Sequence, residues 1–412
     1  MADDKVQVEE YGADEDALNT VNYEEEDDED VELEGGDMEV ELGFLGDKQE
    51  HLGGPFGDWD GGKVGGKPVW LNPNLHAEIK CSKCAKNMSF LLQIYCPLDE
   101  PEHAFHRSLY VFVCRTNDCP QLGHARAFRC QLPQENPFYA NHQDVDYRRR
   151  EAVKPLKRCA VCNLKATFSC SACHVAQYCS KEHQKDHWKH VHKEDCPRCL
   201  SLEELIVTNS SELEVNGSKF VFPEYAIHIE REPESGIAQN ETEEKMMRQF
   251  QQAQSTAGTD VFTDNSVIDI SQKDLSALLG STTTQDKTYL AFLTRVALDK
   301  DQVLRYCRWN EQDAVLWVHS EGKPDEIPAC SICGEPRAFE FQVMPQLLYH
   351  LKLGGEQSIE ALTAVNSKEL DWGTLVVYTC PNSCRRVGTD DEVDFVEEFV
   401  WRQPPFEQVE HA

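Results

Sequence analysis

The chain has 412 residues, of which 40% are hydrophobic, and carries a formal net charge of -33 at pH 7. Its length suits two or three folded units of roughly 100–200 residues each. The charge argues against binding of RNA, DNA or an anionic membrane as the main function, because such binding depends on Lys and Arg side chains that neutralise phosphates. We therefore expect a basic partner, no specific nucleic acid binding and no membrane contact.

No run of about 18 apolar residues occurs, and the amino terminus is acidic where a signal peptide would be basic and then apolar. We therefore expect a soluble, monomeric protein of the cytoplasm and nucleus. Structural disulfides are rare in these compartments, so the 18 cysteines need another explanation. Metal binding is the first to test.

The first segment in chain order is strongly acidic. Residues 1–42 hold 19 acidic residues and one basic residue, Lys5. Such a run buries little apolar surface and repels itself, which predicts that residues 1–41 are an acidic disordered tail.

Residues 42–150 are predicted to form a β unit. They open with glycine and proline every few residues, a pattern that prevents a persistent helix. Apolar, β-branched and aromatic stretches then predict strands at 90–95 and 108–114. A zinc finger is expected over 151–200, and a returning strand region over 201–230.

Residues 231–287 are polar, rich in Gln, Thr and Ser, and nearly free of aromatic residues. They are predicted to be a disordered linker with one transient helix over 243–253. The last segment, residues 288–412, is predicted to be a second β unit with strands at 338–344 and 374–380.

Helices are indicated only at 180–192, 302–307 and 358–365. The predicted fold class is therefore mainly β, with a minor helical part (α+β).

The two β units look like copies of one another. With Cys81 placed on Cys330, an apolar strand follows at the same distance in both, and Gln93 falls on Gln342 without a gap. After spacers of different length, SLYVFVC aligns with TLVVYTC. Chance similarity of composition is the alternative. We favour a duplicated unit whose two copies pack together as one body, with the segments between them inserted.

The densest group of cysteines has eight Cys and His residues in the order CxxC, seven residues, CxxC, five residues, CxxxH, eight residues, HxxxC. Structural zinc takes four thiolate or imidazole ligands, and pairs two to four residues apart can bind one ion from a single turn. A segment this short buries little core, so two ions would supply much of its folding free energy. The ligands are Cys159, Cys162, Cys170, Cys173, Cys179, His183, His192 and Cys196.

These details resemble the MYND-type zinc finger, which has Tyr-Cys, a ligand followed by Gln, then a Trp and a final His and Cys. Tyr178, Gln184 and Trp188 occupy the corresponding positions. The resemblance implies interleaved ligation. One ion would be bound by Cys159, Cys162, Cys179 and His183, and the other by Cys170, Cys173, His192 and Cys196.

The chain departs from this finger in two ways. His183 stands where most MYND fingers have Cys, and imidazole is an acceptable zinc ligand. One extra residue separates Trp188 from the final His, which leaves His187 or His190 as an alternative ligand to His192.

Each β unit has a CxxC before its first strand and a second Cys pair after its second strand, as a zinc site that closes a hairpin needs. The two sets are Cys81, Cys84, Cys114 and Cys119, and Cys330, Cys333, Cys380 and Cys384. Unmetallated core thiols and redox CxxC chemistry are the alternatives, but the redox motif lacks its strand-to-helix setting. We expect about one Zn2+ in each unit besides two in the finger. Buried free thiols are expected at Cys96, Cys130, Cys199 and Cys307.

We expect no catalytic residue and no enzyme activity. His103, His106 and His124 flank the first β-unit set, but each set already has four ligands, whereas a catalytic zinc needs a vacant position. The one dense basic run, residues 147–158, is interpreted as a solvated linker, with a nuclear localisation segment or an RNA contact as alternatives.

Several long motifs together resemble the programmed cell death protein 2 family. They include LGF, GGKPVWL, LLQIYCPL, HRSLYVFVC, FPEYAIHIE, DQVLRYCR, CSICGEPRAFEFQVMPQLL and WGTLVVYTCPNSC, spread over residues 42–402. The resemblance implies a duplicated β-rich domain split by the MYND finger. It also implies a dedicated chaperone that captures a newly made small-subunit ribosomal protein and escorts it to the assembling small subunit.

Charge makes such a function physically reasonable. An acidic escort can screen a basic ribosomal protein, while an apolar groove or sheet edge shields its hydrophobic part. The acidic tail would steer the client, or serve only as a solubility tail. A MYND-type protein-interaction adaptor in transcription is the alternative function. A lysine methyltransferase is disfavoured, because Asn141 and His142 are not followed by the Ser-Cys of its cofactor motif.

Overall fold

A computed structural model describes much of the chain, including both predicted β units and the finger. The described residues are 40–46, 61–116, 118–119, 121, 123–139, 154, 156–198, 218–233, 286–309, 315–351, 370–386 and 394–405. Of the predicted tail over 1–41 and the predicted linker over 231–287, residues 1–39 and 234–285 lie outside these residues, as do the helices predicted at 243–253 and 358–365. Glu41 and Arg231 lie in strands, and Lys287 lies in a helix.

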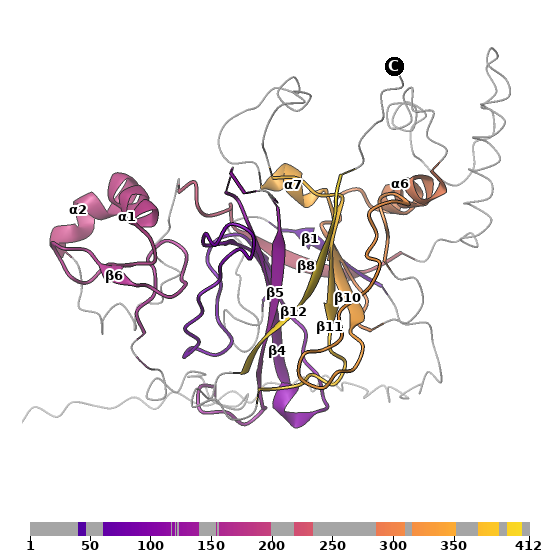
Figure 1. Cartoon of the computed structure of the whole chain (residues 1–412), viewed down its shortest axis with the longest axis horizontal. Helices are drawn as coiled ribbons and strands as arrows, with labels where there is room; N and C mark the ends of the chain where they lie inside the picture. Colours follow the sequence, from indigo (N-terminus) through magenta and orange to yellow (C-terminus); the bar gives the residue numbers. More distant parts are fainter. Residues whose placement is uncertain are drawn as a thin grey trace, which may run out of the picture. The chain divides into compact units, whose positions relative to one another are not determined.

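Ten strands of the described residues form one closed barrel, in the order β1-β8-β2-β3-β4-β5-β12-β11-β10-β9 (Figure 1). Every neighbouring pair is antiparallel. This mainly β architecture confirms the predicted fold class. The strands are β1 (Glu41–Leu45), β2 (Lys63–Val64), β3 (Ser89–Tyr95), β4 (His106–Val113), β5 (Ala125–Leu132), β8 (Tyr225–Arg231), β9 (Leu304–Tyr306), β10 (Ala338–Val343), β11 (Thr374–Thr379) and β12 (Asp394–Gln403).

The described helices are short and lie mostly in the finger. The finger contains β6 (Phe168–Ser169), β7 (Gln177–Tyr178), α1 (Lys181–His187), the π-helix η3 (Trp188–His192), α2 (Lys193–Asp195) and η4 (Cys196–Arg198). Outside it lie η1 (Glu102–Ala104), α6 (Lys287–Leu298) and α7 (Leu347–His350). None of the described helices is both long and apolar enough to span a bilayer.

The two hairpins β3–β4 and β10–β11 carry the same irregularity. Each has one extra residue in its first strand, Leu91 between Phe90 and Leu92 in one half and Glu340 at the aligned place in the other. Such a bulge bends a strand at a fixed position. A shared bulge at aligned positions supports the duplication predicted from the cysteine spacing.

The aligned glutamines make equivalent bonds. Gln93 Oε1 accepts a hydrogen bond of 2.8 Å from the backbone N–H of Val69. Gln342 Oε1 accepts one of 2.7 Å from the backbone N–H of Leu316. Each buried amide therefore holds the segment that crosses the outer side of its own hairpin.

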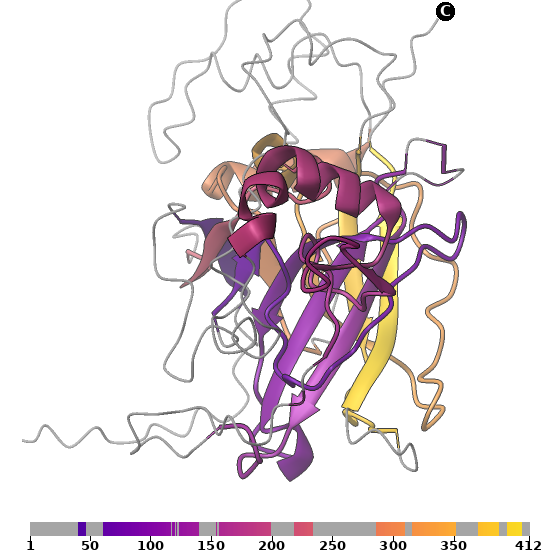
Figure 2. The ribbon, with the colours of Figure 1, turned by 90° about the vertical axis from the view of Figure 1, so that its left-hand side faces the viewer.

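The halves are joined on both sides of the barrel. On one side β5 pairs with β12, and Figure 2 shows the purple strands β4 and β5 beside the yellow β12. On the other side β1 pairs with β9 of the second half, and β8 pairs with β2 of the first half. The strand before the first half, β1, thus pairs with the second half, and the strand before the second half, β8, pairs with the first half. The two copies form one body, as expected.

The core has an inner and an outer layer. β4 is buried at every position, so both of its faces are covered. Leu109, Val111 and Val113 belong to the cluster that fills the barrel together with apolar residues of β10 and β11. Tyr110 and Phe112 belong to another cluster, which also contains the segment before β3 and residues of the finger.

The helix predicted over 302–307 is wrong. Leu304–Tyr306 is strand β9, which pairs with β1 on one side and β10 on the other. Short apolar runs are ambiguous between helix and strand, and here tertiary pairing decides. A helix that the sequence analysis missed, α6, begins after Asp286, whose side chain accepts from the backbone N–H of Thr288 at 2.8 Å.

Candidate metal centres

The sixteen predicted ligands lie in four groups, and in each group four sulfur or ring nitrogen atoms lie within 4.8 Å of one another. The groups are the first knuckle (Cys81, Cys84, Cys114, Cys119), the first finger site (Cys159, Cys162, Cys179, His183), the second finger site (Cys170, Cys173, His192, Cys196) and the second knuckle (Cys330, Cys333, Cys380, Cys384). The two knuckle groups are those that the cysteine spacing predicts, and the two finger groups are those that the resemblance to the MYND finger implies.

The spacing of the donor atoms fits one tetrahedral ion in each group. Two thiolates bound at about 2.3 Å from one zinc ion lie about 3.8 Å apart, and a thiolate and an imidazole nitrogen about 3.5 Å apart. In the first knuckle, Sγ of Cys81 and Sγ of Cys119 are 3.8 Å apart. In the first finger site, Cys159 Sγ is 3.5 Å from His183 Nδ1. A disulfide bond would be about 2.05 Å long, so these groups are suited to zinc and not to disulfides.

All four groups begin with the same tight turn. In each, the residue four places after the first cysteine has a positive φ and donates its N–H to the carbonyl of that cysteine at 2.9 Å. The turn brings the two sulfurs of the CxxC toward one ion. The residues with positive φ are Ala85, Asn163, His174 and Gly334.

The first finger site joins three parts of the finger. Cys159 and Cys162 lie on the turn before β6, Cys179 follows β7, and His183 lies in the first turn of α1. Ser180 is the N-cap of that helix and accepts from the backbone N–H of His183 at 3.2 Å, which fixes where the imidazole emerges.

This site attracts positive charge. Burial alone would lower the pKa of His183, but the hydrogen-bonded sulfurs of Cys159 and Cys179 raise it to about 10. A buried group of three thiols and one imidazole is therefore stabilised by a cation among its donor atoms.

The extra residue of the second finger site is absorbed by a π-helix. Residues Trp188–His192 form η3. A π-helix has hydrogen bonds between residues five apart, where an α-helix has them between residues four apart, so it accommodates one inserted residue. His192 Nε2 consequently lies 3.5 Å from Cys173 Sγ. His187 Nδ1 instead meets the Tyr178 hydroxyl at 2.9 Å, and His190 Nδ1 donates to the Asp186 carbonyl at 3.0 Å. The geometry places His192 in the group and neither alternative histidine.

The finger is bonded to the β body and is not a freely attached module. The backbone N–H of Lys165 donates to the Ala77 carbonyl at 2.8 Å. Trp70 Nε1 donates to the Asn163 carbonyl at 3.2 Å. Finger residues such as Val161 also belong to the apolar cluster that contains β4. The first finger site is thus built against the outer side of the first half.

Comparison with known proteins identifies the family. Models of the N-terminal and C-terminal domains of programmed cell death protein 2 match residues 39–146 and 286–404, and the MYND finger model matches residues 159–196. Programmed cell death protein 2 of Bos taurus is 34% identical over 360 residues, which cover 83% of this chain and 90% of the relative. The chain belongs to the programmed cell death protein 2 family.

More distant relatives match over similar shares of their length. Programmed cell death protein 2-like of Homo sapiens is 26% identical and covers 80% of this chain and 86% of the relative. A Schizosaccharomyces pombe protein named "Probable 20S rRNA accumulation protein 4" is 22% identical, with 82% of this chain and 91% of the relative covered. No solved structure gives a significant match.

In this member of the family, the other histidines singled out in the sequence have structural contacts. His103 Nε2 donates to the Ser383 carbonyl at 2.9 Å, His106 Nδ1 meets the Tyr95 hydroxyl at 2.9 Å, and His124 Nε2 meets Ser82 Oγ at 2.9 Å. Within the described residues, none of the three lies in a metal-ligand group. Cys96, Cys130 and Cys307 are buried thiols, and Cys199 lies outside the described part of the chain.

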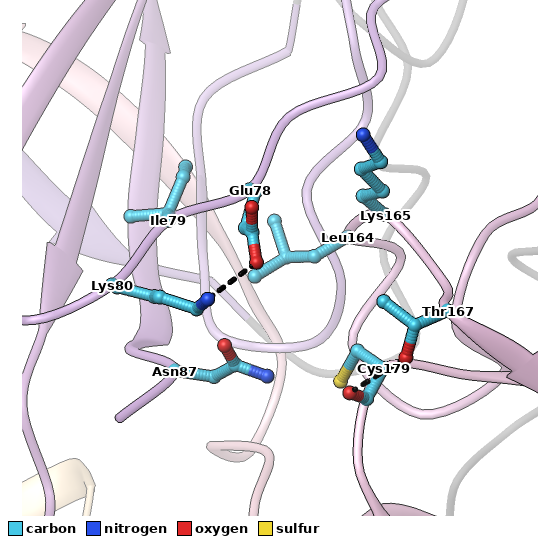
Figure 3. A pocket seen from close by; sticks show the side chains of 8 residues that line it. All are labelled: Glu78, Ile79, Lys80, Asn87, Leu164, Lys165, Thr167 and Cys179. Atoms are coloured by element: carbon cyan, nitrogen blue, oxygen red, sulfur yellow. Dashed lines mark hydrogen bonds and ion pairs between the residues drawn. The ribbon is translucent and has the colours of Figure 1, made fainter. Parts of the chain in front are cut away.

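A small pocket lies beside the first finger site. It has a volume of about 270 Å³ and is bordered by the loop of the first knuckle and by the start of the finger (Figure 3). Glu78 and Lys80 form an ion pair of 2.6 Å in its wall, and Thr167 Oγ1 donates to the carbonyl of Cys179 at 3.4 Å. The charges of Glu78 and Lys80 are thus paired with each other, and the Thr167 hydroxyl is bonded to the backbone.

The residues that hold the metal groups in place were not found from the sequence. Trp70 lies in the GGKPVWL motif. The motif marked this segment as part of the family resemblance but did not indicate that Trp70 bonds to Asn163 of the finger. Arg129 hydrogen-bonds to Glu398 and to the Cys384 carbonyl of the second knuckle. No local motif indicates these contacts, because the bonded residues are more than 250 residues apart in the chain.

Proposed function

We propose that the chain is a dedicated chaperone for a basic, newly synthesised small-subunit ribosomal protein, acting in small ribosomal subunit biogenesis. The observation that carries the proposal is the match over most of both chains to a relative whose name refers to accumulation of 20S rRNA. The net charge of -33 adds that the favoured partner is basic. We further propose that the protein is a monomer, located in the cytoplasm and nucleus, that acts without catalysis.

One row of exposed basic side chains lies on the finger. The helices of the finger carry a lysine at every fourth position, and all four of these side chains are exposed, namely Lys181, Lys185, Lys189 and Lys193. A basic client would be repelled by this row of charges. We therefore propose that the client contacts the β body or the acidic segment and not this side of the finger.

A MYND-type adaptor is the second candidate function. Trp188 in η3 is 41% exposed, which leaves an aromatic surface for a peptide. The contacts between the finger and the first half weigh against a module that acts alone.

The test is affinity purification of the tagged full chain from cells during active translation, with identification of the stoichiometric partner. A basic small-subunit ribosomal protein is expected. Recovery of chromatin proteins without any ribosomal protein would favour the adaptor.

A matched variant separates the two candidates further. Trp188→Ala should keep its metal content and its ribosomal partner if the finger is a structural insertion. Loss of the main partner at unchanged zinc content would instead assign partner binding to the finger.

A further inference from the structure

The second knuckle is the most exposed of the four metal-ligand groups. Cys333 is exposed and Cys384 is half-buried, whereas three of the four cysteines of the first knuckle are buried. Ile332, between the two cysteines of the CxxC, is 40% exposed. Cys330 and Cys380 are buried, so packing of the ligands against a core holds one cysteine of each pair and contributes less here than at the first knuckle.

A buried charged cluster lies under this knuckle. Glu398 of β12 accepts from Arg129 Nε at 2.8 Å and from Arg337 Nε at 2.9 Å. The side chains of Arg129 and Glu398 have no exposed surface, and that of Arg337 is 7% exposed. One carboxylate thus fixes two guanidinium groups by charge-assisted hydrogen bonds.

Each guanidinium also donates to backbone carbonyls on one side of the knuckle. Arg129 Nη2 donates to the Cys384 carbonyl at 2.9 Å. Arg337 Nη1 donates to the carbonyls of Pro328 and Ala329 at 2.7 Å each, directly before Cys330. The three charged residues therefore tie the loop that bears the first cysteine pair to the turn that bears the second.

This cluster also crosses the boundary between the two halves. Arg129 lies on β5 of the first half, and Glu398 lies on β12 of the second half, where the two strands pair. Gln131 of β5 adds a bond of 3.1 Å from its Nε2 to the Ser383 carbonyl. The second knuckle is consequently held in part by residues of the first half.

The neighbouring residue of β12 provides a contrast. Glu397 points to the outside and accepts from Arg126 at 2.6 and 2.7 Å, and Arg126 Nη1 donates to the Lys80 carbonyl before the first knuckle at 2.7 Å. This pair is exposed, with 45% of the Glu397 side chain open to solvent. Both pairs are Arg–Glu ion pairs, but water competes for the hydrogen bonds of the exposed one. The first knuckle is moreover buried by its own packing.

We propose that Arg129, Glu398 and Arg337 are the positioning residues of the second knuckle, which hold its two cysteine pairs at the separation that one metal ion needs. Retention of metal by Cys330, Cys333, Cys380 and Cys384 then depends on the β5–β12 pairing between the halves. Partners that orient metal ligands from behind change metal affinity by about 10- to 100-fold when they are removed. This inference is independent of the proposed client.

The test compares Glu398→Gln with Glu397→Gln in the full zinc-loaded chain, since both change one carboxylate to an amide on adjacent residues of one strand. Zinc transfer to a colorimetric chelator is followed together with pulsed alkylation, and the labelling rate of each cysteine is read by mass spectrometry. With Glu398→Gln, one zinc ion should leave about 10- to 100-fold faster and Cys333 and Cys384 should be labelled correspondingly faster. With Glu397→Gln, the labelling of both should match the parent chain.

Buried thiols outside the four groups distinguish positioning from general destabilisation. Cys96, Cys130 and Cys307 are labelled only when the barrel opens. If their labelling rates rise with Glu398→Gln as much as that of Cys333, the cluster is merely structural and the proposal is wrong. Equal metal retention in the two variants would also overturn it.

If Glu398→Gln does not fold, Arg337→Lys decides. This variant keeps the positive charge beside Glu398 but lacks the planar fork that bonds the Glu398 carboxylate through Nε and the two carbonyls through Nη1 at once. Faster labelling confined to the second knuckle supports the positioning role, whereas labelling equal to that of the parent chain contradicts it.

Discussion

Arg107 and Glu340 form an ion pair in the barrel interior, and neither side chain has any exposed surface. Arg107 Nη2 donates to Glu340 Oε2 at 2.7 Å, and the Thr379 hydroxyl also donates to this carboxylate. Burial would raise the pKa of Glu340, but Arg107 and these hydrogen bonds lower it overall below the ordinary value. The carboxylate therefore stays ionised within the core. The aligned residue of the first half, Leu91, is apolar, so the pair marks a difference between the two copies.

We expect that Arg107→Leu destabilises the protein by about 3–5 kcal/mol, because it leaves the Glu340 carboxylate buried without its partner. The double variant Arg107→Leu with Glu340→Leu should recover much of this loss, since the second half then resembles the first at this position. The free energy of unfolding in urea, measured at constant free zinc, tests both. A double variant whose loss equals the sum of the two single losses would contradict this account of the pair.

At the scale of elements, the two knuckles could be predicted because their information is local, whereas the interleaved grouping in the finger followed from its resemblance to the MYND finger. Cysteines at fixed spacings around a hairpin meet at its end wherever the hairpin lies in the fold. Strand β9 could not be predicted in this way, because Leu304–Tyr306 is extended only through pairing with β1 and β10. The exchange of β1 and β8 between the halves also has no local signal, since it depends on pairings between distant segments.

The π-helix η3 makes a specific prediction about the second finger site. His192→Ala should reduce the zinc content from an expected four ions to three, whereas His190→Ala should leave it unchanged, because only His192 meets Cys173. Native mass spectrometry of both variants gives the count. His190 is a matched control, since it lies two residues away on the same helix. If His190→Ala loses an ion and His192→Ala does not, His190 is the ligand and the prediction is wrong.

At the scale of the whole molecule, the exchanged strands make the two halves depend on each other. The first half lacks a neighbour for β2 without β8, and β9 lacks one without β1. A sheet left open in this way exposes unpaired N–H and C=O groups along its edge. The β5–β12 pairing, with the charged cluster under the second knuckle, closes the other side.

We therefore expect that the separate fragments 40–224 and 225–405 do not fold alone in the presence of zinc but form a soluble complex when they are co-expressed. The cut before Tyr225 leaves β8 with the second half, so that the first fragment lacks the strand that pairs with β2 and the second fragment lacks β1, which pairs with β9. Circular dichroism and amide NMR dispersion of each fragment test this. A fragment that is cooperatively folded by itself would show that the exchanged strand is not required.

The net charge of the chain is concentrated before the barrel begins. Residues 1–39 hold 18 acidic residues and one basic residue, and β1 starts at Glu41. Removing residues 1–39 should leave the melting temperature of the barrel unchanged, because every described strand remains. If the acidic segment steers a basic client, its removal should lower the association rate by about 10-fold or more at low salt and flatten the dependence on salt.

The sharpest form of this experiment keeps the length and changes only the charge. A variant with every Asp and Glu of residues 1–39 replaced by Asn and Gln is compared with the parent chain and with the deletion, by stopped-flow association with the purified client at several salt concentrations. Electrostatic steering predicts that the neutral variant associates as slowly as the deletion, while the dissociation rate changes little. An association rate and a salt dependence equal to those of the parent chain in both variants would leave the segment with solubility as its role.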